Sequence, residues 1–462
     1  MPTRRGFIKQ SGIISLGFMG LQQFACTPAA KKEQIEQVGY GAMLKDVDGI
    51  LNLPKGFSYK IISQMGNKMS DGFYLPGLSD GMATFAENGK TLLVRNHELS
   101  PGDMERSPYG KDGEFLSMLD RSLIYDFGKG EKISVGGTTT AVFNEKTQKV
   151  ETEYLSLTGT IRNCAGGPTP WGSWITCEET QTKADEIIEL DHGYNFEVKA
   201  TSKIGLQKAI PLKAMGRFTH EAIAVDPATS IVYQTEDAGD AIIYRFIPEK
   251  KGDLTKGKLQ ALCIIDQPSC DTRNWPDLTT EPFPRNQPFK VSWIDLEDID
   301  APESDLRLRG YDNGAARFAR SEGMWYDNGE LYFACTNGGK QNNGQIFKYL
   351  PGPYEGTDRE NEQPGTIELF IESDDADILE HGDNLTISPW GDVIICEDKA
   401  TTPKIVGVTP KGQLYTLAEN IGFKSEFAGA CFSPTGDTLF VNIQAPGITV
   451  AIQGPWKNKI IS

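Results

Sequence analysis

One unit recurs along this chain: an apolar strand, a turn that usually contains glycine, a second apolar strand, and then polar residues of the kinds that bind metals. The clearest copy spans residues 383–398, where the sequence reads DNLTISPWGDVIICED. Five further copies occupy residues 80–98, 163–179, 220–237, 322–337 and 426–442. Six strand-rich units with one shared pattern predict small sheets around a common axis. The predicted fold is therefore all-β, a six-bladed β-propeller with inserted loops.

Composition supports a β-rich chain and restricts what it binds. The 462 residues include 49 Gly, 26 Pro and 10% aromatic residues, which favours strands joined by many turns over helical repeats or coiled coils. Lys and Arg number 46 against 63 Asp and Glu, so the formal net charge is −17. Because such a surface repels phosphate backbones and anionic headgroups, we expect no binding to nucleic acid.

Residues 1–26 are predicted to be an export signal. Arg4 and Arg5 precede a short apolar run that ends at Cys26, a pattern that resembles the twin-arginine signal, whose pathway exports folded proteins. Cys26 is a candidate for acylation in a lipoprotein, with ordinary cleavage nearby as the alternative. We expect a tether over residues 27–40 and one catalytic propeller domain over residues 41–462.

This organisation predicts a periplasmic or cell-surface protein. The twin-arginine export machinery is then a partner, and contact with the membrane is made only through an N-terminal lipid. No later segment is apolar enough for a transmembrane helix, so we expect the mature chain to be soluble or tethered only at its start. We also expect a monomer.

Each hairpin brings polar residues from its two ends together, because antiparallel strands place the start of one beside the end of the other. If these strands line the axis, the polar ends meet at one mouth. The predicted metal ligands are Glu98 beside Asp80; Cys164 with Glu178 and Glu179; Glu221 with Glu236 and Asp237; Glu322 beside Asn337; and Asp383 and Asn384 with Glu397 and Asp398. The sixth hairpin offers Glu426 and Asn442, a weaker pair that can be purely structural.

So many carboxylates in one partly desolvated mouth predict bound cations, because like charges a few ångströms apart repel strongly. Oxygen ligands suit Ca²⁺, whereas a thiolate favours Fe or Zn, so Cys164 among carboxylates indicates more than one kind of metal. For any single acid, capping a strand or pairing with Lys or Arg is the alternative. His192 and His381 are expected in turns or at the surface. Cysteines inside apolar strands are expected in the core, namely Cys177, Cys335 and Cys396.

Arg320 lies two residues before Glu322 in FARSEG, so its guanidinium can reach the same mouth. An arginine beside a cation cluster predicts an anionic substrate, a phosphate or carboxylate, between them, with an ion pair to a nearby acid as the alternative. The sequence has no Walker loop, HExxH or dinucleotide fingerprint. Its one GxSxG match, GLSDG at residues 77–81, leads into the first hairpin strand instead of forming a strand-to-helix elbow, so covalent serine catalysis has no support. The remaining prediction is metal-assisted hydrolysis.

Several motifs in one order resemble the PhoX-type alkaline phosphatase family. They are RNHE, NCAGGPTPWGSWITCEE, THEAIAVDP, TEDA, RSEG and the closing EFAGACFSPTGDTLFVNIQ, and the resemblance covers most of the chain after the tether. It implies a six-bladed propeller that holds an iron (Fe³⁺) and calcium (Ca²⁺) cluster with a bridging oxygen and hydrolyses small-molecule phosphomonoesters outside the cytoplasm.

The resemblance also implies roles for single residues. Cys164, Glu221 and Glu322 would be iron ligands, and Arg320 would hold the substrate phosphate. Calcium or iron would be bound by Glu178, Glu179, Asp237 and neighbouring rim acids. Many members of the family carry longer insertions than this chain, which leaves the substrate preference open.

Two alternatives stay open. A calcium-dependent lactonase or esterase propeller would also use acids and Asn around Ca²⁺, but it needs no cysteine ligand. A non-catalytic propeller would use cations structurally and would bind glycans or partner proteins. Loss of metal and activity in a Cys164→Ser variant would favour the phosphatase over the first. Calcium without iron and without turnover would indicate the second.

Overall fold

The structure is a computed structural model of the chain, and it describes residues 38–129 and 132–460. The predicted export signal, Cys26 and nearly all of the predicted tether lie outside these residues. Contacts group Val38–Ile460 into one unit. Within the described ranges, none of the helices has the length and apolar character needed to cross a membrane.

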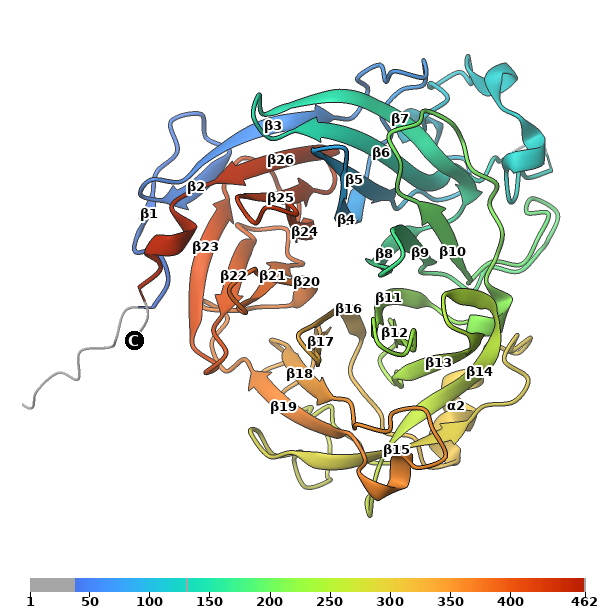
Figure 1. Cartoon of the computed structure of the whole chain (residues 1–462), viewed down its shortest axis with the longest axis vertical. Helices are drawn as coiled ribbons and strands as arrows, with labels where there is room; N and C mark the ends of the chain where they lie inside the picture. The colour runs from blue at the N-terminus through green and yellow to red at the C-terminus, as the bar shows by residue number, and fades with distance from the viewer. Residues whose placement is uncertain (1–37, 130–131, 461–462) are drawn as a thin grey trace, which may run out of the picture. The chain divides into compact units, whose positions relative to one another are not determined.

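The described residues form five sheets of antiparallel strands around a common centre, which confirms the all-β prediction and gives a β-propeller-like arrangement (Figure 1). Six strands surround this centre: β4 (Ser79–Glu87), β8 (Asn163–Pro168), β11 (His220–Val225), β16 (Ser321–Asp327), β20 (Gly382–Ile387) and β24 (Phe427–Phe432). Each forms a hairpin with the next strand, respectively β5 (Lys90–His97), β9 (Ser173–Glu178), β12 (Val232–Glu236), β17 (Glu330–Cys335), β21 (Val393–Glu397) and β25 (Thr438–Ile443). The six predicted hairpins are therefore present.

Outer strands extend the hairpins into larger sheets. These are β6 (Gly136–Asn144), β7 (Lys149–Thr160), β10 (Asn195–Lys199), β13 (Tyr244–Lys250), β14 (Asp253–Ile264), β18 (Gln345–Leu350), β19 (Thr366–Glu372), β22 (Lys404–Val408), β23 (Leu414–Asn420) and β26 (Ile448–Gln453). Strand β15 (Phe289–Asp295) pairs with both β14 and β19. It joins two hairpins into one nine-stranded sheet, so the described strands make five sheets instead of six separate ones.

Strands from the two ends of the described chain close the ring. β3 (Ser58–Gln64) pairs with β26, and β2 (Leu51–Pro54) pairs with β23 and with β1 (Met43–Leu44). A closed ring leaves few free sheet edges, and it ties the beginning of the chain to its end. The composition and the hairpin pattern did not predict these pairings.

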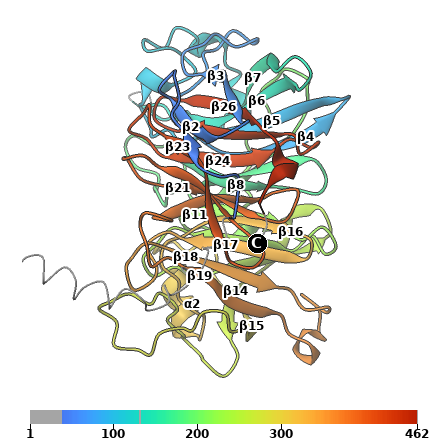
Figure 2. The ribbon, with the colours of Figure 1, turned by 90° about the vertical axis from the view of Figure 1, so that its left-hand side faces the viewer.

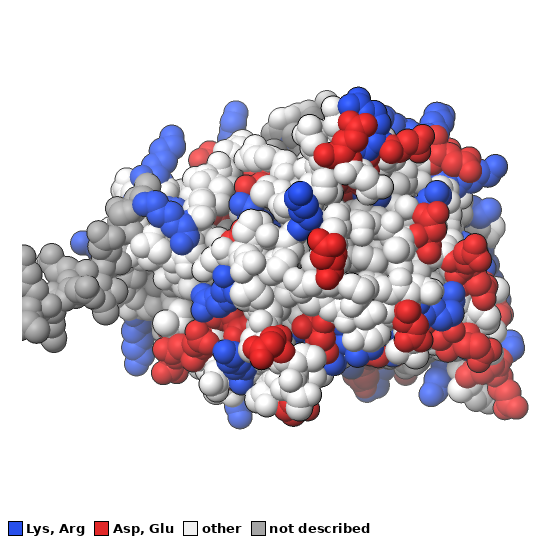
Figure 3. Space-filling model, turned by 90° about the horizontal axis from the view of Figure 1, so that it is seen from below, with Lys and Arg blue, Asp and Glu red and all other residues white. Residues whose placement is uncertain are grey.

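Helices are short and peripheral. Helix α2 (Leu306–Asp312) lies beside β14 and β15, as Figures 1 and 2 both show. The 3₁₀ helices span Met104–Arg106, Leu116–Met118, Arg121–Leu123, Lys213–Met215, Glu360–Glu362 and Trp456–Asn458. Acidic and basic side chains are interspersed over the face shown in Figure 3.

Apolar clusters fill the space between neighbouring sheets. One of them joins Met82 and Phe143 of the β4–β7 sheet to Phe440 of the β24 sheet, and all three side chains are buried. Cys177, Cys335 and Cys396 are fully buried in such clusters, as predicted for core cysteines. This packing holds the inner strands in fixed positions around the centre.

Candidate metal centre

All six inner strands carry the same irregularity close to the end at which they begin. At each of them, two consecutive residues lie opposite a single residue of the partner strand, which is the pattern of a β-bulge. The bulged pairs are Asp80–Gly81, Cys164–Ala165, Glu221–Ala222, Glu322–Gly323, Asp383–Asn384 and Gly429–Ala430. A β-bulge changes the direction in which a side chain points, and the six bulges lie around one centre. Five of the first residues can bind a metal, and the sixth is glycine.

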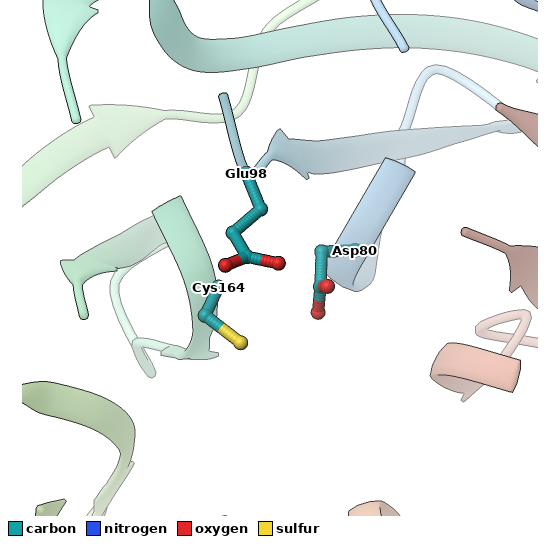
Figure 4. Close-up of side chains that lie close together, drawn as sticks. All are labelled: Asp80, Glu98 and Cys164. Atoms are coloured by element: carbon teal, nitrogen blue, oxygen red, sulfur yellow. The ribbon is translucent and has the colours of Figure 1, made fainter. Parts of the chain in front are cut away.

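Together with Glu98 and Glu179, the bulged residues form three overlapping groups of metal-binding atoms. The groups are Asp80, Glu98 and Cys164; Cys164, Glu179 and Glu221; and Glu221, Glu322 and Asp383. Within each group the ligand atoms lie within 4.8 Å of one another. Figure 4 shows the side chains of the first group pointing toward a shared space. Because Cys164 and Glu221 each belong to two groups, the three groups are continuous.

A second set of acids follows the partner strands. In four hairpins, an acid directly follows the partner-strand residue that pairs with the first residue of the inner strand. These acids are Glu98, Glu179, Asp237 and Asp398. Since successive side chains of a strand point to opposite sides, these four residues differ in direction from the residues just before them. Two of the four, Glu98 and Glu179, belong to the groups above.

Glu178 faces away from these groups and is held inside its sheet. Its carboxylate accepts hydrogen bonds from the backbone N–H groups of Ile161 and Gly193, each at 2.9 Å, and lies 2.6 Å from Nδ1 of His192. Nε2 of His192 lies 3.3 Å from a carboxylate oxygen of Asp126. The structure therefore does not bring Glu178 into these groups, because strand alternation turns it away from the mouth.

His192 is fully buried, which also corrects its predicted place at the surface. Burial alone would lower the pKa of its imidazole. Glu178 and Asp126 outweigh burial and raise that pKa to about 9. The charged ring bridges two carboxylates and holds the segment that follows Glu179.

Glu236 and Glu397 occupy the same position in their own hairpins and also turn away from the mouth. The Glu236 carboxylate accepts a hydrogen bond of 2.6 Å from the hydroxyl of Tyr244. Glu397 accepts hydrogen bonds of 2.8 Å from the backbone N–H groups of Glu380 and Lys404. Like Glu178, these two predicted ligands do not join the groups, because in each hairpin the next residue is the one that turns toward the mouth.

The bulged acids are buried and repel one another. Burial and then the charge of Glu179 raise the pKa of Glu221 well above its usual value, and burial and then Asp237 do the same for Glu322. Burial and Asp398 raise the pKa of Asp383 to about 7. Without a cation these carboxyl groups therefore hold protons far more strongly than free acids do.

Several of these atoms also lack partners. Neither carboxylate oxygen of Glu221, nor Oδ1 of Asp383, has a hydrogen-bond partner among the described residues. Buried polar atoms are nearly always hydrogen-bonded, so such orphans need an explanation. Two ligands on opposite sides of a Ca²⁺ ion lie about 4.8 Å apart, since Ca–O distances are about 2.4 Å. The donor set, its spacing and its orphaned atoms all fit bound cations.

The sixth hairpin differs because Gly429 takes the ligand position. Its φ is +62°, and a Cβ atom built there would lie 2.3 Å from the carbonyl oxygen of Asp80. Asn384, a predicted ligand, is instead buried with its Oδ1 accepting a hydrogen bond of 3.1 Å from the Gly429 N–H. This hairpin contributes Glu426 nearby, and burial and its hydrogen bond to Asp398 raise the pKa of Glu426 to about 11.

Two arginines reach the mouth. Arg320 donates from Nε and Nη2 to Asp237 at 2.8 and 2.9 Å, and its Nη2 lies 3.0 Å from Glu322. Arg162 lies 2.7 Å from Glu98 and also pairs with Glu179. The hydrogen bond to Asp237 raises the pKa of Arg320 further above its already high value, so this side chain stays charged.

The sequence prediction placed Asp80 beside Glu98, but it did not name Arg162 or Gln444 as site residues. Gln444 donates to Asp80 at 2.8 Å and to Glu98 at 3.0 Å. Asp80 holds the position of Glu221 in its own hairpin. Arg162 could have been identified, because it precedes Cys164 by two residues, as Arg320 precedes Glu322.

The space below the bulges is nearly closed. A cavity of about 10 Å³ lies there, lined by the small residues that follow the bulged ligands and by Met82, Trp174, Met324 and Trp325. That volume is about the space that one water molecule needs.

Comparison with known proteins gives the family. The family model described as alkaline phosphatase PhoX matches residues 38–151 and 132–447. PhoX of Pseudomonas fluorescens, solved in complex with vanadate, a transition state analogue, aligns over 90% of this chain and 98% of that chain, with 17% identity and a TM-score of 0.62. At that identity the likeness shows a shared fold.

Other comparisons add little. A gluconolactonase from Xanthomonas campestris aligns over 90% of this chain and 100% of that chain, but with 10% identity and a TM-score of 0.38, which is too low to carry an argument. No curated protein matches the sequence. The family match covers most of the described chain, and it agrees with the hairpins and with the acids that they bring together. The chain belongs to the PhoX alkaline phosphatase family, and it is a phosphatase.

Proposed function

We propose that the mouth is the active centre of an exported phosphatase that hydrolyses phosphomonoesters with iron (Fe³⁺) and calcium (Ca²⁺). One observation carries the proposal: five bulges aim the side chains of Asp80, Cys164, Glu221, Glu322 and Asp383 at one space, where three carboxylate oxygens have no partner among the described residues. Buried anions in this arrangement need cations.

The residues divide by chemistry. Cys164 offers a thiolate, so with Glu221 and Glu322 it would hold iron. Calcium would be held by oxygen donors, which are Asp80, Glu98, Glu179, Asp237, Asp383 and Asp398. When bound, the metal ions polarise the phosphoryl oxygens, lower the pKa of a water or oxo ligand and neutralise the leaving alkoxide.

The arginines would bind and orient the phosphate. Arg320 and Arg162 each use Nη2 on rim acids, and neither Nη1 atom makes a hydrogen bond within the described part of the chain. Two free guanidinium NH₂ groups, one on each arginine, can therefore donate to phosphate oxygens from two sides of the mouth.

The wider organisation is part of the same proposal. We count the nine-stranded sheet as two blades, which gives six blades in one catalytic domain. We also propose export by the twin-arginine pathway to the periplasm or cell surface, with acylation of Cys26 and a monomeric state. A protein that collects iron and calcium inside the cell must fold before it is exported, which fits that pathway.

A cysteine pair tests the proposal. Cys164→Ser removes the one sulfur ligand in the groups, whereas Cys270→Ser changes a half-buried thiol outside them. We expect Cys164→Ser to lose iron, any visible thiolate–Fe(III) absorbance and at least 100-fold in phosphate release. The Cys270→Ser protein should keep all three. Unchanged iron and activity in Cys164→Ser would refute the proposed ligand set.

A further inference from the structure

A second pocket lies on the side of the sheets where the mouth opens. Residues after the end of β14 and after the end of β17 line it, among them Trp275, Leu278, Pro282 and Lys340, and its volume is about 280 Å³. β14 runs in the same direction as β12, so both strands end on the side that carries Glu236 and Asp237. The pocket and the mouth therefore share one face.

Trp275 lines this pocket and also contacts the segments next to Arg320. Its Nε1 donates a hydrogen bond of 2.7 Å to the carbonyl oxygen of Asn337, and its ring edge would lie 3.4 Å from a Cβ built on Gly239. Arg273 fixes the ring: its guanidinium lies 4.3 Å from the ring centre, and its Nη1 donates to the carbonyl oxygen of Gly239 at 2.9 Å.

Asn337 and Gly239 belong to the two segments that hold the backbone of Arg320. The Arg320 N–H donates to the carbonyl oxygen of Ala238 at 2.9 Å, and the N–H of Thr336 donates to the carbonyl oxygen of Arg320 at 3.0 Å. Trp275 thus contacts Gly239 and Asn337, the residues that directly follow Ala238 and Thr336. If the phosphate of a substrate binds Arg320, the alcohol portion can extend past the Trp275 indole into the pocket.

The pocket lining has the chemistry for a ring that carries a negative charge. Its walls are mostly apolar or aromatic, it includes no Asp or Glu, and Lys340 is exposed and makes no ion pair with any described residue. Its volume lies at the lower limit for small-molecule sites, which suits one or two rings. An indole binds flat rings through stacking, and Lys340 adds attraction for an anion.

We propose that Trp275 and Lys340 form a subsite for the alcohol portion of the substrate, and that this subsite favours phosphomonoesters of ring-bearing, anionic alcohols. The inference rests on the proposed phosphatase centre at Arg320. It assigns substrate selection to the segment between β14 and β15, where the chain leaves the ring of sheets.

Three substrates and a control variant test this subsite on the metal-replete protein. The substrates are methyl phosphate, phenyl phosphate and carboxyphenyl phosphate, and KM and kcat are measured for each. We expect Trp275→Ala to raise KM five- to tenfold for both aryl phosphates with little change for methyl phosphate. Lys340→Gln should raise KM two- to fivefold for carboxyphenyl phosphate alone. Trp171→Ala is the control, because Trp171 lies in the turn between β8 and β9, at the other end of the hairpin from Cys164.

The outcomes separate the subsite from the active centre. If the wild-type protein hydrolyses none of the three esters, the proposed function fails and the subsite with it. If it hydrolyses all three and Trp275→Ala changes them equally or not at all, the subsite alone is wrong. Trp275→Phe guards against misfolding, because it keeps a ring in place and should retain most of the preference for aryl phosphates.

Discussion

Arg162 and Arg320 hold equivalent positions in two hairpins. Each lies two residues before a bulged ligand, Cys164 or Glu322, and each has a positive φ, +48° for Arg162 and +42° for Arg320. Positive φ is uncommon outside glycine, so this conformation is held by the surrounding structure. Its effect is to place two guanidinium groups on the rim, each beside a pair of acids.

This equivalence predicts that both arginines bind phosphate. Arg162→Gln and Arg320→Gln should each weaken inhibition by inorganic phosphate by about tenfold or more, which is the effect of losing one charge-assisted contact of roughly 1.5–3 kcal/mol. Competition assays on purified variants measure it. Arg359→Gln is the control, because Arg359 pairs with Glu362 on the exposed surface. An Arg162→Gln protein with unchanged phosphate inhibition would remove Arg162 from the site.

Gly429 is predicted to be irreplaceable at the sixth bulge. Gly429→Ala adds backbone strain and a contact of 2.3 Å with the Asp80 carbonyl, so we expect a loss of roughly 3 kcal/mol or more in the free energy of unfolding. Gly172→Ala isolates the strain, since Gly172 also has a positive φ but nothing within 4 Å of the added atom. That control should lose about 1 kcal/mol. Equal losses in denaturant unfolding would show that the close approach to Asp80 is unimportant.

His192 predicts a pH-dependent stabilisation. Its pKa is raised to about 9 by Glu178 and Asp126, against about 6.5 in the unfolded chain, so the folded state binds the proton more tightly. The contribution is full below pH 6.5 and is lost as the pH rises through 9, and it amounts to roughly 3 kcal/mol. The difference in unfolding free energy between the wild type and His192→Gln should therefore shrink between pH 6.5 and 9. A constant difference would mean that His192 carries no proton in the folded state.

Removal of metal should make stability depend on pH in a defined direction. Because Asp383 has a pKa of about 7 in the folded metal-free protein and a normal one when unfolded, its contribution is full below about pH 4 and falls as the pH rises through 7. Glu221 and Glu322 shift in the same direction. Thermal unfolding of chelated protein from pH 4.5 to 8 should show this loss, and added Ca²⁺ with iron should reverse it. A chelated protein that is as stable at pH 8 as the loaded one would contradict the prediction.

Much of the fold was predictable because the hairpins repeat. Two apolar runs around a turn identified both strands of each unit, and antiparallel pairing placed Cys164 and Glu179 at one end. Glu179 and Glu178 point in opposite directions because they are consecutive residues of an extended chain, and the same holds for Asp237 and Glu236. The pattern alone named both members of each pair, although period-two alternation could have chosen between them.

Other features depend on contacts between segments that are distant in sequence. The bulge at Gly429 follows from the approach of Asp80, and the closure of β3 on β26 follows from completing the ring. His192 is polar and follows an acidic stretch, so local composition placed it at the surface, whereas Asp126 and Glu178 hold it in the interior. Such placements are set by tertiary partners, which a local pattern does not contain.

The central claim is that the converging acids hold metal ions for phosphate ester hydrolysis. It is tested most directly by measuring iron, calcium and phosphate release on one sample, as purified, after chelation and after metals are added back. Both metals should be present at first, and activity should disappear when they are removed and return when they are added back. A metal-free protein that hydrolyses phosphomonoesters at the full rate, or a folded and metal-replete one that hydrolyses none, would contradict it.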